Sequence, residues 1–235
     1  MGKTQHADKY RNIELIRWER DQLIEVLTSR IEFNRAQFRA GPVDDIFHSV
    51  FPNTVSTSHT VNWLAERTLS RPRELIQLSR LYTESVDDDA PSDQALKGAE
   101  SGYSQWKLGD LCSEFTNQYP KLTVFFTAWR SQFPRHPYHF RRADFDDLIV
   151  SLLATTPINE QWFNSIVEAT DVARMIEILY EIGLVGDYVS GGAGGGARTH
   201  YSFEEVHQPR FEELQIHPCF RRALDTRERH RVKKN

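Results

Sequence analysis

The sequence predicts a mainly α-helical protein, in which an N-terminal helical bundle precedes a winged-helix domain with a small β-hairpin wing. Apolar residues recur at helical spacings through most of residues 13–182. Turns rich in proline, glycine and aspartate separate these helical segments. Three helical segments and a short β-like segment precede the glycine-rich run at 190–197, and a second β-like segment follows it.

The first part of the chain predicts a small bundle. One helix is expected from residue 13 to the Gly41-Pro42 pair, a second over 60–69, and a third from Pro72 through residue 82. Their connections are short, as in helical bundles. The apolar positions expected to face the core are Ile16, Leu23, Leu27, Ile31, Val61, Leu64, Leu75, Leu78 and Leu81.

The middle of the chain is also predicted to be helical, over 93–99, 104–118 and 122–133. The run Asp87-Asp88-Asp89 reads as a solvated loop, because a calcium loop needs a glycine and a distal glutamate at fixed positions. Pro134 and Pro137 end the last of these helices.

The C-terminal part gives the order that is typical of a winged helix. Asp144 and Asp171 are expected to cap helices, and Gly183 to end one in the left-handed conformation. The expected elements are helices over 145–153, 161–169 and 172–182, strands over 184–189 and 199–203, and a short helix opened by His217-Pro218. The predicted domains are a lid-like bundle at 1–90, connecting helices at 91–140, a winged-helix domain at 141–226 and a basic disordered tail at 227–235.

Composition excludes several classes of protein. The net charge is −4 and the pI is about 6.1, so no global basic field favours a dedicated nucleic-acid binder. Cys112 and Cys219 fit no metal spacing and no secretory signal is present, which predicts reduced thiols and a cytoplasmic location. No apolar run approaches the ~20 residues of a membrane-spanning helix.

No catalytic motif stands out, so the chain alone is not expected to be an enzyme or to bind a cofactor or a metal. The triplet Gly2-Lys3-Thr4 lacks the upstream strand and glycine of a phosphate loop. His136 and His139 lie in a proline-broken loop without a third ligand nearby, which favours a packing or surface role. The glycine run at 191–196 is not followed by a helix, so it reads as a wing tip and not as a dinucleotide fingerprint.

The stretch 67–76 carries the main candidate site. Pro72 suits the first turn of a helix, Ser70 or its neighbour can cap it, and Glu74 adds negative charge there. Arg71 and Arg73 therefore lie at a helix N-terminus, which favours anions. They either contact a nucleotide phosphate that another domain or chain supplies, or form salt bridges to carboxylates of this chain.

Nucleic acid is the alternative ligand. The helix at 172–182 offers Arg174, but Glu177 and Glu181 lie on the same helix and would repel phosphates. This pattern favours a packing or protein-interaction role, with a DNA-binding winged-helix regulator as the alternative. The remaining candidate residues are Arg198 and His200 on the wing, and Arg229, Arg231, Lys233 and Lys234 in the tail.

Several segments together resemble a known family. They are Asp45-Ile-Phe47, Arg67-Thr-Leu-Ser-Arg-Pro-Arg-Glu-Leu-Ile76, Tyr119-Pro120, Ile178-Leu-Tyr-Glu-Ile-Gly-Leu-Val-Gly186 and Ile216-His-Pro-Cys-Phe220. In this order they resemble the region that follows the ATPase core in bacterial P-loop ATPases of the AAA+/STAND lineage.

The resemblance implies a helical lid followed by a winged helix, with Arg71 and Arg73 as sensors of nucleotide phosphates. The Walker A and Walker B motifs of the family are absent from this sequence, so the chain looks like the C-terminal part of such a protein. The implied function is a non-catalytic regulatory and interaction module, partnered by an ATPase core domain or another protein. ATP would bind only with that core, and the family implies a role in signalling or in defence against phage.

Overall fold

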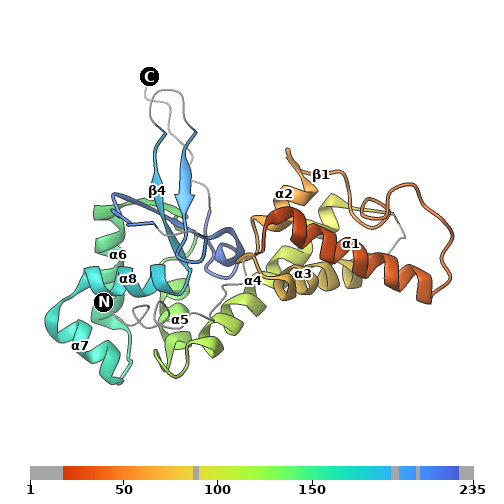
Figure 1. The fold of residues 1–235 in the computed structure, drawn as a ribbon. Helices are drawn as coiled ribbons and strands as arrows, with labels where there is room; N and C mark the ends of the chain where they lie inside the picture. The colour runs from red at the N-terminus through yellow and green to blue at the C-terminus, as the bar shows by residue number, and fades with distance from the viewer. Residues whose placement is uncertain (1–17, 87–89, 192–195, 205–206, 228–235) are drawn as a thin grey trace, which may run out of the picture.

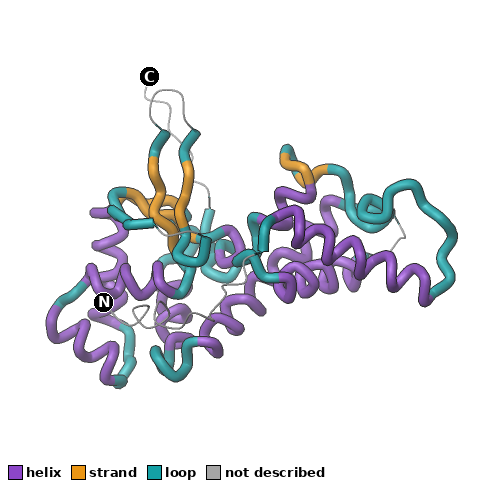
Figure 2. The backbone as a smooth tube through the Cα atoms, viewed as in Figure 1, coloured by secondary structure: helices purple, strands orange, loops and turns teal. Residues whose placement is uncertain are grey.

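The computed structural model describes residues 18–86, 90–191, 196–204 and 207–227 (Figure 1). The protein is mainly α-helical, with a helical part followed by a part that holds a small antiparallel sheet, which confirms the predicted fold class. Figure 2 shows the helical part on one side and the strands of the sheet on the other. No helix in these ranges has the length and apolar character that crossing a membrane requires.

The helical part consists of α1 (Arg20–Gln37), α2 (Thr60–Ala65), α3 (Pro72–Ser85) and the start of α4 (Asp93–Glu114). Their apolar faces bury Leu23 and Leu27 of α1, Leu64 of α2 and Leu78 of α3, as the helical spacing predicts. Three features differ from the prediction. Helix α1 begins at Arg20 and not at residue 13, α2 ends at Ala65, and a hairpin of β1 (Thr54–Val55) and β2 (Ser58–His59) precedes α2; Ile16 lies outside the described residues.

Helix α4 is one continuous helix, although the sequence predicts two helices over 93–99 and 104–118. Buried side chains continue through the expected break at helical spacing, from Ala99 to Tyr103 to Lys107. A glycine such as Gly102 costs only about 1 kcal/mol in a helix interior, and this packing offsets the cost. The helix leads from the bundle into the second part of the molecule (Figure 1).

The C-terminal part of the molecule, from α5 onward, is built around a four-stranded sheet of order β3-β6-β4-β5. The hairpin of β4 and β5 confirms the two predicted strands, whereas β3 and β6 are additional. The sequence does not predict these two strands because they are short: β3 directly follows a segment with two prolines, and β6 lies in an apolar segment without regular spacing. The elements are α5 (Leu122–Gln132), β3 (His139–Arg141), α6 (Arg142–Thr155), α7 (Gln161–Ala169), α8 (Val172–Glu181), β4 (Val185–Val189), β5 (Arg198–His200), β6 (Glu213–Ile216) and the 3₁₀ helix η2 (Pro218–Phe220).

Helix ends test the predicted caps. The side chain of Asp171 accepts a hydrogen bond from the Arg174 N–H at 2.9 Å, and Gly183 has φ of 79°, so both predictions are confirmed. The cap at Asp144 is wrong, because α6 already begins at Arg142 and Asp144 lies in its first turn. The aspartate run at 87–89, the wing tip at 192–195 and the tail at 228–235 lie outside the described residues.

One continuous apolar core joins both parts, from Leu23 of α1 to Leu224 beyond η2. Trp129 and Tyr103 are among its largest fully buried side chains. The Trp129 indole N–H donates to Nε2 of the buried His136 at 2.8 Å, so this histidine is a packing residue. The domain boundaries predicted from the sequence remain predictions.

Gly186 in β4 should be the glycine least tolerant of substitution. A Cβ at this position would lie 2.5 Å from Cγ2 of Thr199 and 2.7 Å from Cε1 of Tyr201, so Gly186→Ala must push β5 away. We expect a loss of about 1–3 kcal/mol in the free energy of unfolding, measured by urea titration. Gly98→Ala in α4 is the matched control, because its added Cβ would meet no atom within 4 Å beyond its own helix backbone. An equal loss in both variants would contradict the packing described here.

His217 should make stability depend on pH. Burial lowers the pKa of this imidazole well below its ordinary value, so the folded protein keeps it neutral while the unfolded chain protonates it. The free energy of unfolding should therefore fall as the pH drops below about 6.5, by up to about 1.4 kcal/mol per pH unit for this group. Urea titrations from pH 8.5 to 5.5 measure the slope. His217→Asn should reduce the slope below pH 6.5, where His136, whose pKa burial also lowers, still contributes, and it should leave the slope unchanged between pH 7.5 and 8.5; an unchanged slope below pH 6.5 would contradict the assignment.

Candidate functional site

The turn before α3 is held from inside by Glu74. Its Oε2 accepts a hydrogen bond from the Leu69 N–H at 2.5 Å, so a side chain of the first helical turn satisfies a backbone donor before the helix. Ser70 has φ of 55° and Arg71 occupies the N-cap position without a side-chain cap bond. The expected cap by Ser70 or its neighbour is therefore wrong, and Glu74 fixes the turn instead.

Glu74 is buried against a cation that the sequence did not identify. Its Oε1 lies 2.7 Å from Nζ of Lys107 on α4, and the two side chains are 1% and 0% exposed. The same Nζ lies 3.3 Å from Oδ2 of Asp110. A lysine at a core position of α4 is the only sequence signal for this pair, because fully buried lysines are almost always paired.

Arg71 and Arg73 both reach across to α4. The guanidinium of Arg71 donates two hydrogen bonds to the Glu114 carboxylate, at 2.8 and 3.0 Å, and these bonds raise its pKa above the ordinary value. Arg73 donates to Asp110 and lies over the Trp106 ring at 5.4 Å. Of the two roles predicted for these arginines, the structure thus provides the salt bridges within the chain.

A third arginine of the same stretch is not predicted as a site residue by the sequence. Arg67 lies over the ring of Trp63 at 3.8 Å and donates to Glu100 of α4 at 2.6 Å. Glu100 also pairs with Arg222 near the C-terminus at 3.3 Å. The Arg67–Ile76 stretch therefore joins the bundle, α4 and the C-terminal segment through ion pairs, which we call the arginine–carboxylate network.

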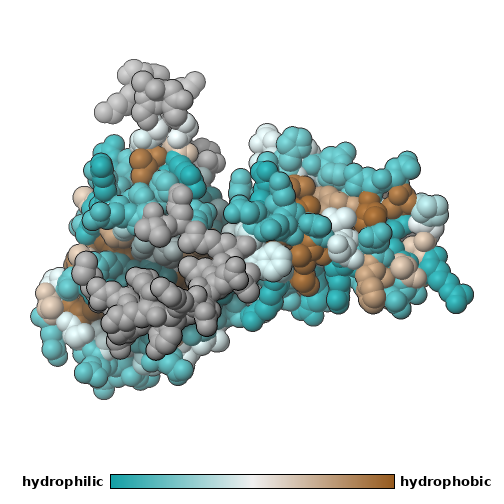
Figure 3. Space-filling view, in the orientation of Figure 1, coloured by the Kyte–Doolittle hydropathy of each residue, from teal (hydrophilic) through white to brown (hydrophobic). Residues whose placement is uncertain are grey.

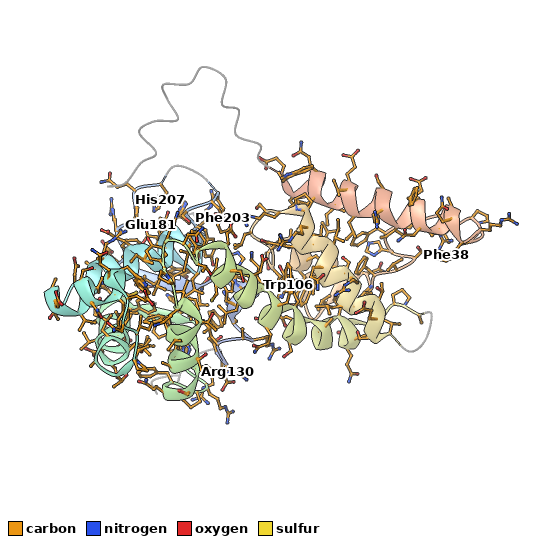
Figure 4. All side chains as sticks on the ribbon, turned by 90° about the horizontal axis from the view of Figure 1, so that it is seen from below. Phe38, Trp106, Arg130, Glu181, Phe203 and His207 are labelled. Carbon is orange, nitrogen blue, oxygen red and sulfur yellow. The ribbon has the colours of Figure 1, made fainter. Side chains whose placement is uncertain are left out.

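A pocket of about 800 Å³ opens beside Arg71. Three segments distant in the sequence line it: the start of α1 with Arg20, the turn with Ser70 and Arg71, and the wing side with Arg198 and Phe203. Figure 4 shows Phe203 where the sheet side of the molecule meets the bundle. Three guanidinium groups at one pocket can receive an anion, whereas Glu19 and Glu204 on its rim limit the net positive charge.

The predicted nucleic-acid residues do not form one basic surface among the described positions. Arg174 is held by Glu177 and Glu181 at 3.0 Å each, and the bonds to Glu181 raise its pKa. His200 stacks on His207 at 4.1 Å and lines a different pocket from Arg198. Arg229, Arg231, Lys233 and Lys234 lie outside the described residues.

The described residues also contain three histidine–acid or histidine–thiol contacts. His139 Nε2 lies 2.9 Å from Oε2 of Glu213 on the neighbouring strand β6. His207 Nε2 lies 2.7 Å from Oδ2 of the buried Asp187, where the carboxylate accepts, and it also accepts from two backbone N–H groups, which orders the segment before β6. The Cys219 Sγ lies 3.0 Å from Nδ1 of His217, but burial raises the pKa of the thiol and lowers that of the imidazole. This pair is therefore neutral and unsuited to nucleophilic chemistry. In the part of the chain that the structure describes, no cluster of His, Cys, Asp or Glu could hold a metal ion.

Comparison with protein families gives one match. Residues 21–112 match the family model FunZ_C, described as the FunZ-associated C-terminal helical domain. The match covers α1 to α3 and nearly all of α4, which includes the Arg67–Ile76 stretch and its α4 partners Lys107 and Asp110. No curated protein and no solved structure matches the chain. The similarity therefore concerns a helical module that is associated with another protein or domain.

The buried and the exposed ion pairs of the network should differ in energy. Lys107→Met leaves the Glu74 carboxylate buried without its cation, and we expect a loss of about 3–5 kcal/mol in the free energy of unfolding. Arg71→Ala removes the pair with Glu114, whose side chains are 47% and 38% exposed, and a longer contact of 4.0 Å to Glu74, and Lys107 still pairs with that carboxylate, so the cost should stay at about 1 kcal/mol. Urea titrations at pH 7.5 measure both. A loss of similar size in the two variants would show that burial does not determine how much each ion pair contributes to the free energy of unfolding.

Proposed function

We propose that this chain is a non-catalytic regulatory module that acts with a nucleotide-binding core of the P-loop ATPase type, which another domain or chain supplies. The observation that carries the proposal is the position of Arg71, at the start of α3 and on the wall of an 800 Å³ pocket that also contains Arg20 and Arg198. Such a pocket can receive a phosphate group or a carboxylate from a partner.

Three further features support this proposal. The match to a FunZ-associated C-terminal helical domain is compatible with an accessory module that accompanies another domain. The buried His217–Cys219 pair is neutral and offers no activated nucleophile. The resemblance of the motifs to the lid and winged helix of AAA+/STAND ATPases suggests that the module relays the nucleotide state, as in signalling or phage-defence switches of the cytoplasm.

DNA binding is the second candidate, because three helices followed by a β-hairpin occur in the order of a winged helix. The electrostatics of α8 count against it. The exposed side chains of this helix include Glu177 and Glu181, and Arg174 is already paired with both. A helix that presents two carboxylates to the major groove would be repelled by the phosphates.

The first proposal is tested by identifying the protein that co-purifies with the tagged chain and by measuring its ATP turnover. We expect a partner with a Walker A motif, whose turnover changes at least about fivefold when the chain is added, while the chain alone hydrolyses no ATP. Arg71→Ala should remove most of this effect. Arg130→Ala on α5 is the control, since Arg130 lies at the far end of that helix, away from the pocket (Figure 4).

Two results would contradict the proposal. One is a stoichiometric partner without a nucleotide-binding motif. The other is sequence-selective DNA binding by the chain at nanomolar affinity, weakened about 10³-fold or more between 50 and 200 mM salt, which would favour the winged-helix regulator.

A further inference from the structure

A second concave surface lies on the bundle, away from the arginine–carboxylate network. It is a groove of about 220 Å³ between α1, α3 and the turn at 46–51. Figure 3 shows hydrophobic residues at the surface of this part of the molecule, surrounded by hydrophilic ones. The described residues that line the groove are Leu27, Arg30, Ile31, Asn34, Val50, Phe51, Ile76, Ser79, Arg80 and Thr83.

The floor of the groove is apolar and rigid. Phe51 is 1% exposed and its ring stacks on Phe47 at 4.9 Å and on Tyr82 at 5.1 Å. The Tyr82 hydroxyl donates to the Val50 carbonyl at 2.9 Å and thereby ties the turn to α3. Ile76 is 38% exposed at the edge. A pre-formed apolar floor with an exposed anchor residue favours binding, because little order must be gained when a partner docks.

The rim of the groove is basic. Arg30 and Arg80 lie on opposite walls, from α1 and α3, and the described lining contains no carboxylate. Arg30 has no ion-pair partner among the described residues, and Arg80 has only Glu84 at 3.6 Å on its exposed side. In a protein of net charge −4, this local positive charge selects an acidic partner.

We propose that this groove binds an acidic amphipathic helix of a partner protein. A large apolar side chain of that helix enters between Ile76 and the Phe51 floor, and carboxylates on its flanks pair with Arg30 and Arg80. Recognition of an amphipathic helix by an apolar groove depends on anchors spaced three or four residues apart. The surface lies wholly within residues 21–112, the part of the chain that matches a FunZ-associated domain, so it extends the proposed function by naming a docking surface.

The test uses a fluorescein-labelled helical peptide of about 16 residues, with leucine at every third or fourth position and glutamate on the flanks. Fluorescence anisotropy should give a dissociation constant on the order of 10 µM at low salt, and a matched peptide with lysine in place of glutamate should bind at least about tenfold more weakly. The double variant Arg30→Glu/Arg80→Glu should weaken the acidic peptide by at least about tenfold.

The apolar anchor is tested separately. Ile76→Glu should weaken binding by at least about tenfold, whereas Val167→Glu on α7, at 39% exposure against 38% for Ile76, should leave it unchanged. Thermal unfolding midpoints of the variants confirm that they are folded. Three results would overturn the proposal: equal affinity for the two peptides, no binding of the acidic peptide at 1 mM, or binding that Val167→Glu weakens as much as Ile76→Glu does.

A concentration-dependent dimer in light scattering that Ile76→Glu abolishes would also overturn it, because the occupant would then be a second copy of this chain. These measurements contain no ATPase. Their failure therefore leaves the proposed regulatory function standing, and failure to find a Walker A partner leaves the peptide result standing.

Discussion

The ion pair between Glu74 and Lys107 is the interaction on which the other features of this protein depend. Both side chains are almost completely buried, at a contact of 2.7 Å between α3 and α4. The same Glu74 carboxylate binds the Leu69 N–H and so fixes the turn that places Arg71. Burying two charges costs several kcal/mol of desolvation, which their attraction offsets only in a well-fixed geometry. The pair therefore specifies how α3 and α4 pack more than it adds to stability.

This geometry limits what the arginines of the turn can do. Arg71 and Arg73 are both paired with carboxylates of α4, and of the two only Arg71 lines the pocket. A ligand phosphate at this site must compete with Glu114 for the Arg71 guanidinium. An anion bound there would therefore loosen the pairing between the turn and α4. The groove beside Arg30 and Arg80 shares no lining residue with this pocket, so the two proposed contacts concern separate surfaces.

Periodicity predicted most of the helices, because apolar spacing reports directly on which face is buried. It failed at α4, where two helices over 93–99 and 104–118 were predicted and tertiary packing makes one, and at β3 and β6, which are too short to show a pattern. The helix start at Pro72 was predictable from proline chemistry. Its partners were not, since Lys107 and Glu114 lie more than thirty positions away and only the fold brings them to the turn. The pocket was invisible for the same reason, because Arg20, Arg71 and Arg198 come from three separate segments.

A double-mutant cycle on Glu74→Gln and Lys107→Met tests the central claim most directly. The free energies of unfolding of the parent, the two single variants and the double variant give the coupling energy between the two side chains. We predict a coupling of about 2–3 kcal/mol, with the double variant more stable than the sum of the single losses implies. Losses that add to within about 0.5 kcal/mol would show that the two residues act independently and that the pair does not organise the turn.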